Sequence, residues 1–351
     1  MGDAEGRLEP TLFLCSQKSP RGEAEGAIPV RLSPRVRREL NEIIGFFCER
    51  TDGSPIALLR ILYGALAVWT SLFLLPNYER YYTESGRLPW DKVKHFPEHI
   101  YSILQFAPQS SAFVYAVVWT AIIASFCLLL GVMSRLAAFV LFAIQVALQH
   151  RNPFILNSGD HLYLIIAFLL SLTPSDRKWS LRSYFAHRRG KGESSPIFAW
   201  STRLIGLQIC YVYLYAFAAK INSKPWINGT AMYDVFASPS LARWPAELDY
   251  PVLLALITWG TLVFELFFPL FVWQKEYRRY AIPAGILFHL GIEVTMVLPM
   301  FSALMMISYA SFLDDEEARA ILSFPRRFID RLRGKTSPSP AEVEAHVSPS
   351  D

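Results

Sequence analysis

Long apolar segments are the feature that most constrains what this 351-residue chain can fold into. A helix that crosses a bilayer needs about 20 mostly apolar residues, because unpaired backbone groups cannot face lipid. The chain is 52% hydrophobic and 18% charged, whereas soluble domains have about 25% charged residues. Candidate spans lie near residues 56–76, 112–132, 134–149, 160–174, 202–221, 251–273, 279–298 and 300–314. The chain is therefore predicted to be all-α, a polytopic transmembrane helical bundle with about eight spans. The segments that start near 134, 160 and 300 are short, which favours buried or re-entrant helices.

The distribution of positive charge predicts the orientation of the bundle, because cytoplasmic loops collect Lys and Arg. With eight spans and an internal N-terminus, the internal segments hold most of the cations, including the Arg-rich start, the loop that contains "DRKWSLRSYFAHRRGK" and the stretch "PRRFIDRLRGK". The first outer loop is an exception, with Arg80, Arg87, Lys92 and Lys94. The N- and C-termini are both predicted to be cytoplasmic.

The chain divides into three regions by composition. Residues 1–50 are predicted to be a basic, largely disordered cytoplasmic segment, 51–315 a transmembrane domain, and 316–351 a basic and then Pro/Ser-rich cytoplasmic tail. No cleavable signal peptide is expected, because the first residues contain no continuous apolar stretch.

Six ionisable residues are predicted to lie at membrane depth or at the outer membrane surface. They occur in "NPFILNSGDHLYL", "FAAKINSKPW", "LVFELFFPLF" and "FHLGIEVTMVLPMFS", and they are Asp160, His161, Lys220, Glu265, His289 and Glu293. Such residues are expensive in a bilayer, and each is a functional hypothesis by default.

Structural alternatives exist for most of these residues. Lys220 ends a span, where a lysine can extend its ammonium to the interface. Asp160 follows a glycine and can cap the helix that begins there, and His161 beside it is as compatible with an interfacial hydrogen bond as with catalysis. Glu265 lies at mid-span among apolar neighbours, so its carboxyl must be protonated or paired.

Two further structural interpretations concern helix ends and helix faces. His289 and Glu293 are four residues apart on one helical face and can satisfy each other. Arg60 heads the first span, and its side chain is expected to extend to the cytoplasmic phosphates.

Familiar site motifs are absent from the chain. It contains no G-x-x-x-x-G-K-[ST], H-E-x-x-H, C-x-x-C or G-x-S-x-G motif, and its histidines do not cluster as metal ligands would, so no metal is predicted. The net charge of +4 is too small to indicate nucleic acid as a partner.

Four stretches carry a resemblance to a known family. "RILYGALAVW", "NSGDHLYLIIAFLLSLTPSDRKWSL", "QICYVYLYAFAAKINSKPWINGTAM" and "FHLGIEVTMVLPMFS" are similar to the HTTM family, which includes vitamin K-dependent gamma-carboxylase. The similarity runs over most of residues 55–315. The carboxylase continues beyond this region into a large luminal domain that helps hold its protein substrate, so carboxylation of a docked protein is not implied for this chain.

The resemblance assigns roles position by position. An ungapped register places the carboxylase base, a lysine that deprotonates vitamin K hydroquinone, on Lys220, with Ala219 at the preceding lysine position. Trp226 matches the tryptophan that follows, and the "FH" and "MFS" marks fall on residues 288–289 and 300–302. The carboxylase histidine thought to act on the glutamyl carbanion falls opposite Gly159, two residues before His161.

The implied function is that of a vitamin K-dependent gamma-carboxylase-like membrane enzyme, a lyase or epoxidase. Its catalytic residues would be Lys220 and His161, and its quinone pocket would include Asp160, Trp226, Glu265, His289 and Glu293. Reduced vitamin K or a related naphthoquinol and O2 would be consumed, with CO2 and a glutamate-containing protein or peptide if it carboxylates.

Membrane lipid is a further expected partner. The expected location is the cell inner or plasma membrane, or the endoplasmic reticulum in a eukaryote, with the site on the extracytoplasmic side. The alternative is a non-catalytic scaffold or a lipid or solute carrier, in which Lys220 only extends to the interface.

Overall fold

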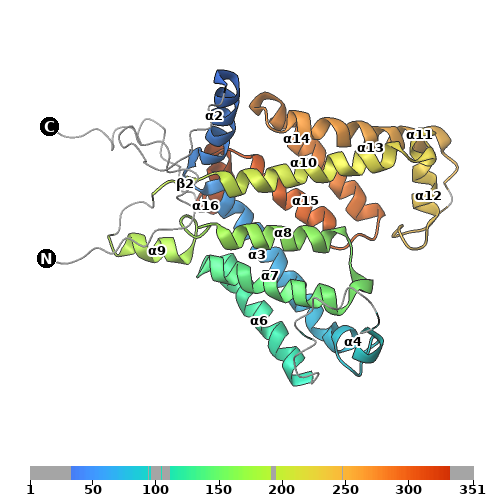
Figure 1. Ribbon diagram of the computed structural model, residues 1–351, viewed down its shortest axis with the longest axis horizontal. Coiled ribbons are helices and arrows are strands. Elements are labelled where there is room, and N and C mark those ends of the chain that lie inside the picture. The colour runs from blue at the N-terminus through green and yellow to red at the C-terminus, as the bar shows by residue number, and fades with distance from the viewer. Residues whose placement is uncertain are drawn as a thin grey trace.

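Eight helices follow the eight apolar segments closely. The computed structural model describes residues 33–93, 95, 104, 111–190, 195–246 and 248–332. The eight helices are α3 (Ser54–Leu74), α6 (Ser111–Leu130), α7 (Ser134–Arg151), α8 (Ser158–Leu172), α10 (Trp200–Ile221), α13 (Pro251–Phe271), α14 (Lys275–Thr295) and α15 (Phe301–Ser308). They form a helical bundle, as predicted, in which α8, α10 and α13 run nearly parallel and α3 and α6 cross them obliquely (Figure 1).

Four stretches of the described chain are long and apolar enough to cross a membrane. They are Ser54–Tyr82, Ala112–Leu130, Trp200–Ile221 and Pro251–Phe271. Helix α8 and the stretch Phe301–Phe312 are apolar but shorter, in line with the short segments expected near 160 and 300. Of the eight predicted spans, all are helices and four meet the length and hydropathy requirement for crossing.

Short elements connect the long helices and flank them. Residues 1–32 and 333–351 lie outside the described ranges. Most of the two terminal segments that the sequence predicts to be disordered fall in these ranges. The predicted N-terminal segment 1–50 also contains a helix, α2. The strands β1 and β2 pair antiparallel with Arg50 opposite Phe198, which the sequence did not predict. The elements are α2 (Pro34–Cys48), β1 (Arg50–Thr51), η1 (Leu75–Asn77), α4 (Tyr78–Tyr82), α5 (Trp90–Val93), η4 (Pro153–Ile155), α9 (Leu181–Arg188), β2 (Ile197–Phe198), α11 (Lys224–Ile227), α12 (Ala231–Ala237), η5 (Tyr309–Phe312) and α16 (Asp315–Leu332).

Close backbone contact joins α3 to α6. A Cβ atom added at Gly64 would lie 2.7 Å from the Cα atom and from the backbone nitrogen of Leu129. Such an approach is possible only without a side chain, and small residues serve the same purpose at many helix contacts in membranes. Gly64, in the stretch "RILYGALAVW", therefore has a packing role.

Arg60 does not extend to the membrane surface, so the sequence-based interpretation of this residue was wrong. Its side chain is completely buried. The guanidinium donates to the carbonyl oxygens of Leu128 and Leu129 at 2.8 Å each, of Ser175 at 3.1 Å and of Trp179 at 2.5 Å. The last carbonyls of α6 have no partner within their own helix, and Arg60 supplies one while tying α6 to the loop that follows α8.

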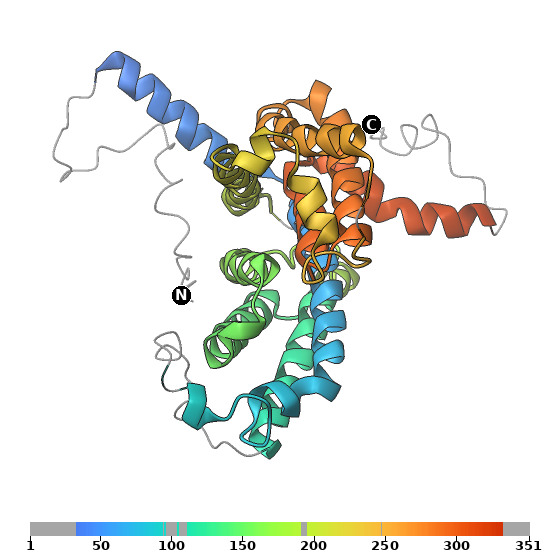
Figure 2. The same ribbon diagram turned by 90° about the vertical axis from the view of Figure 1, so that its right-hand side faces the viewer.

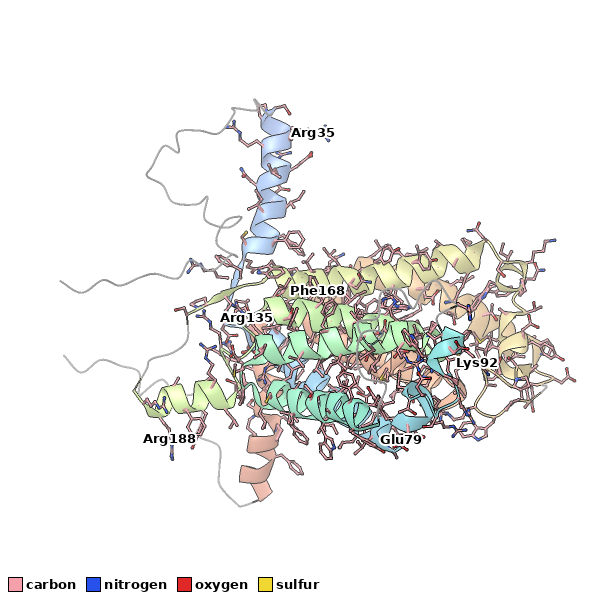
Figure 3. The ribbon with its side chains drawn as sticks, turned by 60° about the horizontal axis from the view of Figure 1, so that its bottom comes forward. Arg35, Glu79, Lys92, Arg135, Phe168 and Arg188 are labelled. Atoms are coloured by element: carbon pink, nitrogen blue, oxygen red, sulfur yellow. The ribbon has the colours of Figure 1, made fainter. Side chains whose placement is uncertain are left out.

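One end of the bundle is rich in arginine. Figure 3 shows Arg35, Arg135 and Arg188 at this end, and Glu79 and Lys92 at the opposite end. The arginine-rich end also contains the start of α16, where Asp314 and Glu317 exchange backbone-to-carboxylate hydrogen bonds of 2.9 Å in a reciprocal helix cap. We refer to it below as the basic end.

Ion pairs fix the start of α16 to α14. Arg278 contacts Asp314 at 3.2 Å and Glu317 at 2.8 Å, and Lys275 contacts Asp314 at 2.9 Å. Burial opposes ionisation of the Asp314 carboxyl, but its hydrogen bonds with Glu317 and Lys275 and the nearby cations outweigh this effect and lower its pKa below the ordinary value.

Replacement of Asp314 by asparagine should separate the charge of this residue from its capping role, because asparagine caps helices as well as aspartate does. A lowered pKa in the folded state gives stability that is present above the ordinary aspartate pKa and is lost as the pH falls through the folded pKa. We expect Asp314→Asn to reduce the free energy of unfolding by about 1 kcal/mol at pH 7, given that the pair is partly exposed. The difference should shrink below pH 4 in detergent-solubilised protein, and a difference that is constant with pH would contradict the ion-pair interpretation.

Candidate functional site

Lys220 and Glu265 form an ion pair between two membrane-crossing helices. Lys220 lies in the last turn of α10, and Glu265 lies in the middle of α13. The Lys220 ammonium donates to Glu265 Oε1. The Glu265 side chain is only 5% exposed and the Lys220 side chain is 24% exposed. The Glu265 carboxyl was expected to be protonated or paired because its neighbours are apolar, and its partner is Lys220.

Trp226 completes this cluster from the short helix α11. The Lys220 Nζ atom lies 4.9 Å from the centre of the Trp226 ring, a distance at which the ring face attracts a cation. Among the described residues, the second carboxylate oxygen of Glu265, Oε2, is buried without a hydrogen-bond partner. Three residues that the sequence analysis selected, Lys220 and Trp226 from one stretch and Glu265 from another, thus meet at the end of the bundle opposite the basic end.

His289 belongs to a second polar group, formed with two tyrosines that the sequence analysis did not select. His289 Nε2 lies 2.8 Å from the hydroxyl of Tyr213, which in turn lies 2.5 Å from the hydroxyl of Tyr309. The three residues are 2% exposed or less, and His289 Nδ1 has no hydrogen-bond partner among the residues that the structure describes. Tyr213 lies seven residues before Lys220 on α10, and this two-turn spacing is the signal that would have pointed to it.

Glu293 does not pair with His289, so the proposed pairing on one face of α14 is not formed. Glu293 instead lies 3.6 Å from the guanidinium of Arg243, with both side chains more than 40% exposed. Arg243 also donates to the backbone carbonyl of Glu293 at 2.9 Å. His289 points into the bundle, while Glu293, one turn later, meets the segment that follows α12.

Asp160 takes part in capping α8, although the N-cap is Asn157 and Asp160 is the third residue of the helix in a capping box. Its Oδ2 atom accepts a 2.8 Å hydrogen bond from the backbone of Asn157, and the Asn157 side chain accepts from Gly159 at 2.7 Å. Gln145 and Gln149 of α7 add hydrogen bonds to the side chain and the backbone of Asp160. These contacts account for the polar atoms of this residue without a ligand.

A cavity of about 520 Å³ adjoins Asp160. It has a wall of aromatic side chains, including Trp69, Tyr78 and Tyr163, and Arg243 and Glu293 also line it. Lys220, Trp226, Glu265 and His289 are not among its lining residues. The residues that the sequence analysis grouped as one quinone pocket therefore divide among this cavity, the Lys220 cluster and the His289–tyrosine group.

His161 is exposed on α8. Among the contacts between described residues, none joins it to the Lys220–Glu265 pair. Position 159, where the carboxylase histidine falls in the ungapped register, has no room for a side chain. A Cβ atom there would lie 2.9 Å from the Pro299 carbonyl oxygen and 2.9 Å from the Phe301 backbone nitrogen.

Comparison with known sequences identifies the family. The HTTM domain model matches residues 48–316, which is most of the chain. The chain belongs to the HTTM domain family. With its four apolar helices, this HTTM protein is an integral membrane protein.

Two relatives of the HTTM protein come from Bacillus subtilis strain 168. The sporulation-delaying protein SdpB is 26% identical over 45% of this chain, and the uncharacterized protein YitO is 25% identical over 60%. The alignments span 51% of SdpB and 71% of YitO. No solved structure matches the HTTM protein. Within the described residues, no group of three or more His, Cys, Asp or Glu side chains that could hold a metal ion was found.

Proposed function

We propose that this HTTM protein is a membrane enzyme of the vitamin K-dependent gamma-carboxylase type, which oxidises a reduced naphthoquinone with O2 to its epoxide. The observation that supports the proposal is the ion pair of Lys220 with the buried Glu265. The lysine has the position of the carboxylase base, and the carboxylate is the group to which it can pass its proton.

The apolar surroundings make this proton transfer inexpensive. Two separated charges are poorly solvated among apolar side chains, so the ionic form of the pair loses much of the advantage it has in water. When the ammonium proton moves to Glu265, the product is a neutral amine beside a neutral carboxylic acid. A neutral amine is a competent general base for a hydroquinone hydroxyl.

The Lys220 side chain is partly exposed, so a quinol can approach it while most of the solvent is kept away. The side chain is 24% exposed beside the Trp226 ring, so a flat aromatic ring from the lipid phase has an edge to approach and an aromatic face to stack on. Exclusion of bulk water protects a reactive anion from side reactions.

The balanced reaction converts the hydroquinone and one O2 into the quinone epoxide and one water. In the finer version of the proposal, the oxygenated quinol also removes a γ-proton from a glutamyl residue of a protein or peptide, and CO2 adds to the carbanion. His161 has no contact that supports its predicted role in that step, and its catalytic role stays a prediction.

The site is proposed to face the extracytoplasmic side of the cell inner or plasma membrane, or of the endoplasmic reticulum in a eukaryote. Lys220 lies in the last turn of α10, and α10 leads to α11 at the end of the bundle away from α2 and α16 (Figure 1). Cations gather on cytoplasmic faces.

The direct experiment is to follow the 2,3-epoxide by chromatography after purified protein in detergent is mixed with reduced vitamin K under air. We expect epoxide with the wild type under air and none without O2. Folded wild-type protein that forms no epoxide from reduced vitamin K or reduced menaquinone would favour a non-catalytic scaffold or carrier.

Replacement of Glu265 by glutamine tests the proton acceptor. Glutamine keeps the size of the side chain and can still bind Lys220, but it cannot take a proton from it. We expect epoxide formation to fall by about 100-fold, the usual contribution of a positioned acid–base group. Glu276→Gln, an exposed change on α14, is the matched control and should retain the wild-type rate. An unchanged rate in Glu265→Gln would remove Glu265 from the mechanism.

A further inference from the structure

Helix α2 has an apolar face that no other part of the described protein covers. Val36, Leu40, Ile43 and Ile44 have the spacing of one helical face, and they are 45%, 42%, 56% and 38% exposed. No residue of α2 is buried. An exposed face of this size in a soluble helix would be a site of association.

Helix α16 repeats the pattern at the other terminus of the described chain. Ile321, Phe324 and Phe328 share one face and are 50%, 62% and 52% exposed. The rings of Phe324 and Phe328 stack with centres 6.0 Å apart. Arg319 and Ser323 lie on the opposite side of the helix, so the two faces differ sharply in polarity.

The two helices leave the bundle at the same end and run across its axis. In Figure 2, α8 and α10 are seen nearly end-on, while α2 and α16 extend outward in different directions in the plane of the view. Figure 3 shows α2 and α16 running across the long direction of the bundle. This is the direction that a helix lying in the plane of a membrane would have relative to a membrane-crossing helix such as α10.

Specific contacts hold both helices in this direction. The Phe46 ring near the end of α2 packs on Trp273 with centres 5.4 Å apart, and the Arg203 guanidinium lies 4.6 Å from the centre of the Phe46 ring. At the start of α16, Arg319 contacts Asp52 at 2.7 Å, and the carboxylate of Asp315 accepts from the backbone of Asp52 at 2.9 Å. These contacts fix the positions of the two exposed apolar faces relative to the bundle.

We propose that α2 and α16 are interfacial helices that lie in the headgroup region at the basic end of the bundle, with their apolar faces among the acyl chains and their arginines on anionic phospholipid headgroups. The lipid surface is the occupant that fits, because both helices lie at one end of a bundle whose apolar helices are long enough to cross a membrane. Amphipathic helices with arginine on the polar side bind such surfaces, and cations near an anionic leaflet strengthen the binding. The described arginine side chains on α2 are Arg35, Arg37 and Arg38, of which Arg35 and Arg38 also contact Glu39 and Glu42, and α16 adds Arg327.

The first test maps the surroundings of each face by photocrosslinking. The full chain is reconstituted in nanodiscs with a benzophenone amino acid at Leu40 or Phe324, and at the adjacent polar positions Asn41 or Ser323 as matched controls. We expect phospholipid adducts, detected by mass spectrometry, to be at least fivefold more abundant at the apolar positions. Equal adducts on both faces, or adducts between two copies of the chain in place of lipid, would overturn the proposal.

The second test concerns the headgroups. Nanodiscs of phosphatidylcholine are compared with nanodiscs that contain 30% phosphatidylglycerol, and the variant Arg35→Gln/Arg37→Gln/Arg38→Gln is compared with Lys224→Gln at the opposite end. We expect the anionic lipid to raise the thermal midpoint of the wild type and of Lys224→Gln by several degrees, and to raise that of the triple variant clearly less. The same rise in all three proteins would overturn the assignment of anionic lipid to α2.

Discussion

Replacement of Lys220 by arginine is expected to abolish quinol epoxidation while the protein remains folded. Arginine keeps the positive charge and the ion pair with Glu265, but a guanidinium does not lose its proton in proteins and cannot act as the base. The loss should be at least about 1000-fold, because both the base and its proton acceptor stop working together. Epoxide yield per folded protein, measured as above, is the readout.

Two further variants complete this experiment. Lys220→Ala should be equally inactive, but it leaves Glu265 without its cation and is expected to lower the thermal midpoint as well. Lys224→Ala, an exposed change in the neighbouring helix α11, should retain wild-type activity. If Lys220→Arg turns over reduced vitamin K at the wild-type rate, the proposed base is wrong and Lys220 has the structural role that the sequence also allowed.

Replacement of Arg60 by methionine is expected to produce the largest loss of stability among the substitutions considered. Methionine fills a similar volume but removes the donor to four carbonyl oxygens. The two hydrogen bonds to Leu128 and Ser175 are buried and those to Leu129 and Trp179 are partly buried, and the Leu128 carbonyl keeps a 3.1 Å hydrogen bond from the Gly131 backbone. We expect the free energy of unfolding to fall by about 3 to 5 kcal/mol, since each buried acceptor without a partner costs about 1–3 kcal/mol before relaxation. The quantity can be measured by denaturation with sodium dodecyl sulfate in mixed micelles.

Lysine at position 60 tests the geometric part of this account. A single ammonium cannot reach carbonyls in as many directions as the planar guanidinium, so Arg60→Lys should recover less than half of the lost stability. Arg188→Met, an exposed change on α9, should lie within about 0.5 kcal/mol of the wild type. Full stability in Arg60→Lys would mean that charge, and not the hydrogen-bond geometry, is what α6 requires.

The course of the helices could be predicted from the sequence because hydropathy depends on local composition. All eight apolar segments are helices, and the need of Glu265 for a partner followed from its apolar neighbours alone. The identity of that partner did not follow. Lys220 and Lys224 both lie near the same membrane surface, and only the packing of α10 against α13 selects Lys220.

The interpretations of Arg60 and of His289 with Glu293 show where local reasoning fails. An arginine near the end of a span can reach phosphates or buried carbonyls, and the choice depends on which loop folds over it. The four-residue spacing of His289 and Glu293 placed them on one side of α14, but it did not reveal that Tyr213 and Arg243 lie within reach. In each case the competing partner is distant in the sequence from the residue that it contacts, so the spacing between the two could not identify the contact, although the two-turn spacing of Tyr213 and Lys220 would have marked Tyr213 as a neighbour of the site.

The tight approach of α8 to residues 299–301 bears on how reactions divide within this family. The space that a histidine would fill at position 159 is occupied by the backbone near Pro299 and Phe301. Under the proposed function, a chain built in this way keeps the lysine that would act on the quinol, while the position that corresponds to the carboxylase histidine has no room for a side chain. The proposal then makes oxidation of the quinol separable from carboxylation, with the energy that oxygen releases available to a different acceptor or to none.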